Sequence, residues 1–361
     1  MKTRNRIAAA IVAPLTAISL AACSAPGGDD GPADEEISIT LVQGVTALPF
    51  AQTTAAGATA AIEEIGGIDF EVTGPANIDP AAEVKIFQQV VSTRPDGILL
   101  QELPPELFTR PVEDAEEAGI VVLPYTIAPA ADSTSTAFVG DNGFDLGRFG
   151  ADAVADALIE QFGSDDVSGD IVTGICVPGL SVLTSRIDGF RERITERLPG
   201  VNVLEPFDSK PDPAQNFTVW QQAVSANPDA IGMMSPCEAD VQNLIKIKQD
   251  SGAEWQLVGF DINDVSLQGL RDGMIVGLFP QSSYLHGYVS ARILAEALKN
   301  DTALPDGWVE IEVVPVTAEN VEEIAERESS AEAQAAFWQP YIDEIFSSDP
   351  VKTRPLAEAN Q

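Results

Sequence analysis

From Ile37 onward, short apolar runs alternate with longer stretches of helical periodicity. The first set of predicted strands is Ile37–Val42, Ile68–Thr73, Asp96–Leu100 and Ile120–Leu123. A second set follows a short strand at Thr136–Val139, namely Asp170–Cys176, Val201–Leu204, Ala230–Ser235, Gln256–Gly259 and Met274–Phe279. Strands that alternate with helices through short connections are typical of a parallel sheet with helices on both faces. The sequence therefore predicts an α/β fold with two doubly wound parallel-sheet lobes.

One strand of the second set ends in residues suited to a ligand. The run Gln256–Gly259 stops abruptly at Phe260 and Asp261. In open α/β sheets, ligands bind outside the carboxyl ends of the strands. Phe260 and Asp261 are therefore candidate cleft residues, one apolar and one a hydrogen-bond acceptor. The alternative is a plain helix start, with Asp261 or Asn263 as its N-cap.

The composition excludes several partners. The chain has 361 residues, of which 45% are hydrophobic, enough for two domains with cores. Its formal net charge of −36 would repel nucleic acid and an anionic bilayer surface. We interpret the acidity as favouring solubility, with attraction of cations as the alternative. No phosphate-binding glycine loop or zinc ligand set stands out in the sequence, so no metal and no cofactor is predicted.

The first 36 residues are predicted to target and tether the chain. Basic Lys2, Arg4 and Arg6 precede an apolar stretch, Ile7–Leu20, that is too short for a membrane span of about 20 residues. Leu20-Ala21-Ala22-Cys23 then resembles the bacterial lipobox. We expect a signal peptide at 1–22, a lipidated Cys23 that anchors the protein to the cell membrane outside the cytoplasm, and a flexible tether at 23–36. The alternative is an ordinary signal peptide with an incidental cysteine.

Two further cysteines, Cys176 and Cys237, lie at or just after the ends of predicted strands. Outside the cytoplasm, an even pair is a disulfide candidate, and the two strands would be neighbours in a doubly wound sheet. The alternative is two reduced, buried thiols.

The last part of the chain, 331–361, is predicted to be a helical extension. Residues 319–347 are amphipathic, with apolar side chains at helical spacing. We expect this segment to pack on one lobe, and the alternative is a helix that docks a partner.

Several motifs, in order, resemble the ribose- and galactose-type periplasmic sugar-binding proteins of ABC importers. These motifs are the lipobox, Leu48-Pro49-Phe50, Gly140-Asp141-Asn142, Ser185-Arg186-Ile187-Asp188-Gly189-Phe190, Val258-Gly259-Phe260-Asp261 and Gln281. The resemblance covers about residues 37–316. It implies the type I periplasmic binding protein fold, in which two lobes joined by a multi-strand hinge close over a ligand.

The resemblance also implies a division of the chain. The N-terminal lobe would comprise 37–140 and 282–308, and the C-terminal lobe 141–281 and 309–330. The chain would cross between lobes near Asp141, near Gln281 and near 300–309.

Site residues carry over position by position from the resemblance. The implied ligand-binding set is Phe50, Glu102, Tyr125, Asp141, Arg186, Ser235, Phe260, Asp261 and Gln281. Arg186, Asp261 and Gln281 match the family pattern outright. In the first lobe, Leu48 and Ala51 replace an amide and a ring, and Tyr125-Thr126-Ile127 replaces a polar pair. The second-lobe half of the site is therefore better preserved, which makes ribose itself a poor candidate.

The residue types suit a sugar, because charged planar groups such as Arg186 and Asp261 make strong hydrogen bonds to hydroxyls. The competing interpretations are that Arg186 is an exposed helix residue and that Glu102 is a solvated loop acid. Trp220 is expected in the core.

The predicted function is therefore that of a monomeric solute-binding lipoprotein, not an enzyme, that passes a sugar or related polyhydroxylated ligand to ABC permease subunits. A ligand sensor for a membrane receptor remains an alternative, as does a binder of a nucleoside or a sugar alcohol. A transcriptional regulator would need a basic helix-turn-helix in place of the acidic tether. Among enzymes, a His triad is disfavoured because the one histidine, His286, is expected on a helix surface. A glycosidase pair of Glu102 and Asp261 stays open.

Overall fold

The structure is a computed structural model that describes residues 36–348 and 350–360. The predicted signal peptide of residues 1–22 and the predicted lipidation site Cys23 lie outside the described residues. Within the described residues, no helix combines the length and the apolar character that a membrane-spanning segment needs.

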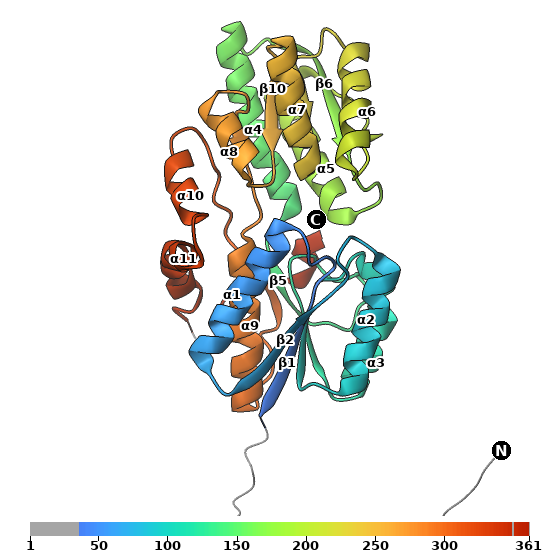
Figure 1. The fold of residues 1–361 in the computed structure, drawn as a ribbon, viewed down its shortest axis with the longest axis vertical. Coiled ribbons are helices and arrows are strands. Elements are labelled where there is room, and N and C mark those ends of the chain that lie inside the picture. The colour runs from blue at the N-terminus through green and yellow to red at the C-terminus, as the bar shows by residue number, and fades with distance from the viewer. Residues whose placement is uncertain (1–35, 349, 361) are drawn as a thin grey trace, which may run out of the picture. The chain divides into compact units, whose positions relative to one another are not determined.

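The first lobe is built on a four-stranded parallel sheet with the order β2-β1-β3-β4 (Figure 1). Its strands are β1 (Ile37–Val42), β2 (Ile68–Thr73), β3 (Gly97–Leu100) and β4 (Val121–Pro124). Helices α1 (Pro49–Ile65) and α9 (Ser283–Asn300) cover one face, and α2 (Pro80–Thr93) and α3 (Thr109–Glu117), preceded by the short η1 (Pro105–Leu107), cover the other. On β3, Leu99 packs towards α9 and its neighbours Ile98 and Leu100 pack towards α2 and α3. This two-sided burial explains why the strand is a continuous apolar run.

The second lobe repeats this architecture on a six-stranded parallel sheet. Five strands run in the order β11-β10-β9-β6-β7, and β8 pairs with β6. The strands are β6 (Ser168–Ile175), β7 (Gly200–Val203), β8 (Phe207–Asp208), β9 (Gly232–Met234), β10 (Gln256–Gly259) and β11 (Gly277–Leu278). Helices α4 (Gly143–Phe162) and α5 (Ser181–Arg197) pack on one face, and α6 (Pro213–Ala226), α7 (Glu238–Ser251) and α8 (Asp264–Arg271) on the other. The predicted α/β fold with two parallel sheets is confirmed.

Glycines bring one helix pair in each lobe into close contact. A Cβ at Gly287 would lie 1.9 Å from the Thr54 carbonyl oxygen, so α9 meets α1 backbone to backbone. A Cβ at Gly147 would lie 2.0 Å from the Arg186 carbonyl oxygen, so α4 meets α5 in the same way. Any larger residue would push these helices apart. The second contact fixes the helix that carries Arg186.

Three chain segments connect the two lobes. The first leaves β5 (Ala137–Gly140) and enters α4 at Asp141. The second runs from β11 to α9 through Gln281. The third follows β12 (Gly307–Glu310), which pairs with β5, and reaches Val316, which bridges to Leu278 of β11.

The prediction of one strand over Val309–Val316 is therefore wrong, and so is the crossing predicted near 300–309. Backbone pairing with β5 begins at Gly307, and the strand ends at Glu310. The crossing accordingly lies between Glu310 and Val316. The sequence did not reveal this because residues 307–316 form one apolar-rich stretch that shows no break where its hydrogen-bond partner changes.

The C-terminal segment packs on both lobes, which corrects the expectation that it packs on one. Helix α10 (Val321–Arg327) lies against α8 of the second lobe, where Arg271 Nε is 2.7 Å from Glu322 Oε1. Helix α11 (Ala331–Ile345) lies against α9 of the first lobe, and the Arg292 guanidinium sits 4.1 Å from the centre of the Phe346 ring (Figure 1). The final turn η2 (Leu356–Asn360) returns to β12, beside the bridge between Arg354 and Trp308.

Candidate functional site

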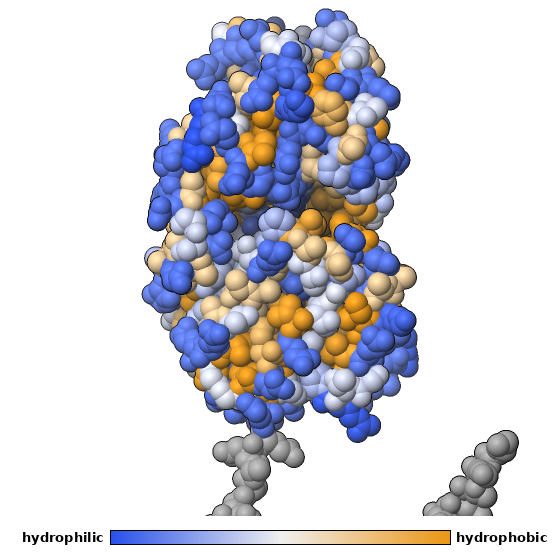
Figure 2. All heavy atoms as spheres, in the orientation of Figure 1, coloured by the Kyte–Doolittle hydropathy of each residue, from blue (hydrophilic) through white to orange (hydrophobic). Residues whose placement is uncertain are grey.

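A cavity of about 440 Å³ lies where the carboxyl ends of the strands of the two lobes face each other. Side chains from both lobes line it, together with Gln281 on the second crossing segment. Figure 2 shows the hollow between the lobes, with apolar side chains gathered at its edge. Its size lies within the range of roughly 300–1,000 Å³ that is usual for small-molecule sites.

Arg186 is the most deeply placed charged residue of the cavity wall, and its side chain is only 4% exposed. It lies on the inward face of α5, together with Leu183, Ile187 and Phe190. Its Nη1 donates to the Pro236 carbonyl oxygen at 3.5 Å and its Nη2 to Gln281 Oε1 at 3.4 Å. Within the described residues, its Nε has no hydrogen-bond partner. The alternative of an exposed helix arginine is therefore wrong.

Phe260 supports Arg186 from below. The guanidinium carbon lies 5.6 Å from the centre of the Phe260 ring, which is fully buried and does not line the cavity. A cation held over an aromatic face is stabilised by the ring quadrupole. Phe260 therefore orients the arginine, and its predicted direct contact with ligand stays a prediction.

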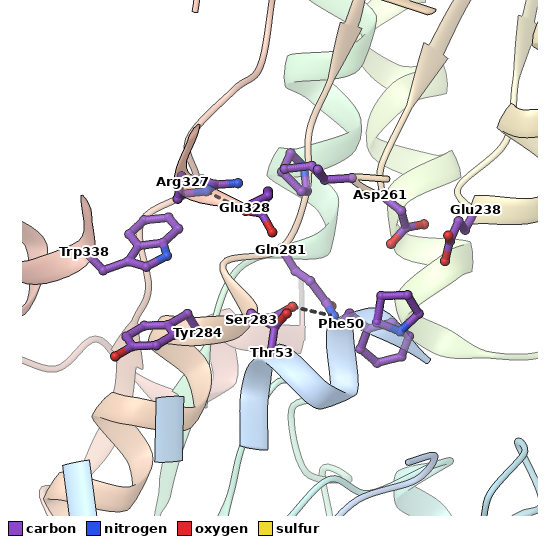
Figure 3. A pocket seen from close by; sticks show the side chains of 13 residues that line it. Phe50, Thr53, Glu238, Asp261, Gln281, Ser283, Tyr284, Arg327, Glu328 and Trp338 are labelled. Carbon is purple, nitrogen blue, oxygen red and sulfur yellow. Dashed lines mark hydrogen bonds and ion pairs between the residues drawn. The ribbon is translucent and has the colours of Figure 1, made fainter. Parts of the chain in front are cut away.

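Asp261 faces the cavity because the cap of the next helix is a different residue. Asn263 accepts from the Ser266 backbone N–H and forms the capping box of α8. The Asp261 carboxylate is thus left free for the cavity, where Figure 3 shows it opposite Phe50. Burial raises the pKa of Asp261 to about 6, and the nearby Arg186 guanidinium partly offsets this rise.

Glu238, which the sequence prediction missed, stands beside Asp261 at the start of α7 (Figure 3). Burial raises the pKa of Glu238, although Asn263 and Gln242 both donate to its Oε1 at 3.1 Å. The signal available in the sequence was its position directly after Cys237, at the end of a predicted strand and the start of a helix.

Phe50 and Gln281 complete the polar end of the cavity. Phe50 lies in the first turn of α1, which Pro49 begins, and it lines both the cavity and a smaller pocket of about 70 Å³ beside it (Figure 3). Gln281 accepts from Arg186 and donates through Nε2 to Ser283 Oγ at 3.4 Å. Four of the nine predicted residues, Phe50, Arg186, Asp261 and Gln281, thus line one cavity.

The other predicted residues, besides Phe260, are engaged inside the protein. Ser235 donates to the buried carboxylate of Asp240, and Tyr125 is fully enclosed where it bridges to Val139. Asp141 lines a separate pocket, with its Oδ2 3.1 Å from His286 Nε2. Glu102 is 1% exposed, so the alternative of a solvated loop acid is wrong. Their roles as ligand contacts stay predictions.

His286 does not lie on a helix surface, as the sequence analysis expected. It is fully buried on α9, between Asp141 and Thr126, whose Oγ1 lies 2.8 Å from His286 Nδ1. The reason is that α9 packs on the sheet, on α1 and on α11 at once, so its polar positions are also enclosed. Trp220 packs in the core of the second lobe against Phe207, as predicted.

Cys176 and Cys237 form a disulfide in the structure. It joins the end of β6 to the residue that begins α7, and both cysteines line the cavity. Glu102 and Asp261, the carboxyl pair of the glycosidase alternative, do not face a common cavity. Within the described residues, no cluster of three or more potential metal ligands occurs.

The sequence of this chain is similar to those of known binding proteins. A family described as "Periplasmic binding protein domain" matches residues 39–302. The xylose/arabinose-binding protein XylF of Sulfolobus acidocaldarius is 22% identical over 246 residues, which are 65% of this chain and 60% of that protein. The chain thus matches less than two thirds of the length of this curated relative.

Solved structures share the fold. The glucose-galactose binding protein GanP of Geobacillus stearothermophilus aligns with a TM-score of 0.71 at 19% identity, covering 80% of this chain and 99% of that one. A carbohydrate transporter solute-binding protein of Agrobacterium radiobacter, in complex with D-arabinose, aligns with a TM-score of 0.72 at 22% identity, covering 84% and 99%. The two-lobed sheets, the cavity between them and the match over most of the chain lead to one conclusion: the chain belongs to the family of periplasmic binding protein domains.

Proposed function

We propose that this protein captures a sugar or related polyhydroxylated ligand in the cavity between its lobes and delivers it to the permease of an ABC transporter. The observation that carries the proposal is the set of Arg186, Asp261 and Gln281 facing one interlobe cavity. Arg186 supplies an unpaired buried donor, and the Asp261 carboxylate supplies an acceptor. Such a pair suits hydroxyl groups, which donate and accept at the same time.

Ligand selection follows from burial. A hydroxyl that meets Arg186 or Asp261 makes a charge-assisted bond, whereas a ligand that lacks it leaves a buried polar group unpaired, at a cost of about 1–3 kcal/mol. Closure of the lobes about the three crossing segments would exclude water and present a new surface to the permease. The proposed lobes follow the two sheets, and no catalytic step belongs to this function.

The proposed location is the outer face of the cell membrane, where a lipidated Cys23 tethers a monomer. The family is one of periplasmic binding proteins, which fits a site outside the cytoplasm. Expression of the full chain and of a Cys23→Ala variant, followed by membrane fractionation, tests the anchor. We expect the variant to leave the membrane fraction, and equal retention of both proteins would contradict the anchor.

A thermal-shift screen of pentoses, hexoses, sugar alcohols and nucleosides tests ligand capture. A ligand present at 100 times its Kd should add about 2.7 kcal/mol to the free energy of unfolding. We expect at least one polyhydroxylated compound to raise Tm by several degrees and to bind with one-to-one stoichiometry in calorimetry. A flat response across every class would contradict the proposed function.

A further inference from the structure

The polar groups of the cavity that are free to meet a ligand gather at one end. Arg186, Asp261 and Gln281 lie together near the second crossing segment, with Glu238 beside them (Figure 3). Arg186 Nε has no partner within the described residues, and Asn263, not Asp261, caps the neighbouring helix. This end of the cavity, which we call the polar end, suits a sugar head group.

The rest of the wall is apolar on both sides. The first lobe contributes Val45, Leu48, Ile78, Leu103 and Ile127. The second lobe contributes Val177, Leu180, Val182 and Leu183, together with prolines and the disulfide Cys176–Cys237. We call this part the apolar wall. Figure 2 shows apolar side chains at the edge of the hollow, in agreement with this distribution.

The polar side chains interspersed in the apolar wall are already engaged within the protein. Gln101 Oε1 accepts from the Gly44 backbone N–H at 3.1 Å, and the Thr126 hydroxyl bonds His286. Asn243 donates to Asn216 Oδ1 at 2.7 Å and to the Pro213 carbonyl oxygen at 3.0 Å. Gln242 donates to Glu238.

A free monosaccharide carries hydroxyls around its whole edge. In this cavity, those that point away from the polar end would face hydrocarbon and sulfur and lose their water without gaining a partner. A sugar that carries an apolar substituent avoids this loss and gains from burying that substituent. We propose that the natural ligand is a glycoside, with its sugar at the polar end and an apolar aglycone against the apolar wall. This inference rests on the proposed function and narrows its ligand class.

Isothermal titration of the purified protein with matched ligand series tests the inference. Each series contains a free sugar, its methyl glycoside and its phenyl glycoside, with xylose, arabinose, glucose or galactose as the head group. In at least one series, the phenyl glycoside is expected to bind at least tenfold more tightly than the methyl glycoside and the free sugar. A Leu48→Ser/Ile78→Ser variant should bring this ratio close to one.

The control is Val72→Ser, because Val72 is 42% exposed, Ile78 is 38% exposed, and Val72 lies outside the cavity. It should leave the ratio unchanged. Since the readout is a ratio within one protein preparation, partial unfolding of a variant does not mimic the effect.

Three results would overturn the inference. Free sugars or methyl glycosides that bind as tightly as phenyl glycosides in every series would remove the apolar aglycone and leave the proposed function standing. The same holds for nucleosides that bind more tightly than any phenyl glycoside, and for a ratio that survives the double variant. Absence of binding by all compounds, including sugar alcohols and nucleosides, would overturn both the inference and the proposed function.

Discussion

The two lobes treat buried acids near the cavity in opposite ways. In the second lobe, the carboxylate of Asp240 is fully buried and receives hydrogen bonds from Ser209, Ser235 and Asn216. In the first lobe, Glu83 and Glu102 are equally buried, but their carboxyl oxygens lack side-chain partners within the described residues. Burial raises the pKa of Glu83 to about 9 and that of Glu102 to about 8.

The difference separates recognition from coverage. The second lobe offers the cavity fixed polar groups whose supports are already hydrogen-bonded, and such groups need little reorganisation when a ligand arrives. The first lobe keeps its acids protonated at neutral pH behind Leu103 and offers the cavity mainly hydrocarbon. We therefore expect the second lobe to dominate affinity and the first lobe to close over the ligand.

Removal of Arg186 should have the largest effect. Arg186→Ala leaves ligand hydroxyls and Asp261 without their buried cationic partner, and affinity should fall by on the order of 100-fold or more. Titration calorimetry with the best ligand of the screen measures this change. Arg191→Ala is the matched control, because Arg191 lies on the same helix but faces Asp188 and Glu205 at the surface. Equal losses in both variants would contradict the role of Arg186.

The disulfide gives the second-lobe wall a cross-link that the first-lobe wall does not have among the described residues. A Cys176→Ser/Cys237→Ser variant should lower the free energy of unfolding by about 2–4 kcal/mol, because the sulfurs no longer restrict the unfolded chain. Urea unfolding measures this loss. Reductant should destabilise the natural protein and leave the variant unchanged, and an equal response of both would argue against the bond in solution.

The two first-lobe glutamates predict a stability that falls as pH rises. Their folded pKa values lie above the ordinary value of 4.5, so the folded state holds protons that the unfolded state releases. Stability is greatest below about pH 4.5 for these groups and declines as pH rises towards 8–9. A Glu83→Gln/Glu102→Gln variant should be more stable than the natural protein by on the order of 2 kcal/mol at pH 8, with little difference near pH 5. Parallel pH curves for the two proteins would contradict this account.

The smallest expected effect concerns ligand affinity at acidic pH. With a folded pKa of about 6, Asp261 loses its charge as pH falls through this value. Affinity should then weaken by up to about tenfold per pH unit below 6, because a neutral carboxyl accepts hydroxyl donors less strongly. Asp261→Asn should bind more weakly at pH 7.5 and show a flatter profile. An unchanged pH profile in that variant would remove Asp261 from ligand contact.

Much of the fold was readable from sequence because buried parallel strands leave clear boundaries. The predicted bounds of Ile37–Val42, Ile68–Thr73 and Gln256–Gly259 match the structure to the residue. Asp79 caps α2 as predicted, through its bond to the Ala82 backbone N–H. In these segments, local propensity and tertiary burial favour the same structure.

The site was only half readable, because a strand end fixes where a residue starts and not where its side chain points. Phe50 and Asp261 point into the cavity, whereas Ser235 and Glu102, also at strand ends, turn into the protein. The burial of His286 depends on helices distant in sequence, and so does the placement of the C-terminal segment on both lobes. The apolar wall was missed because its members are ordinary aliphatic residues in separate loops.

A crystal structure of the protein with its tightest-binding ligand tests the central claim most directly. The account predicts ligand oxygens within about 3 Å of Arg186 and Asp261, and an apolar group packed between Leu48, Ile78 and the disulfide. A ligand held elsewhere, or one whose hydroxyls face the apolar wall while Arg186 and Asp261 contact only water, would contradict it.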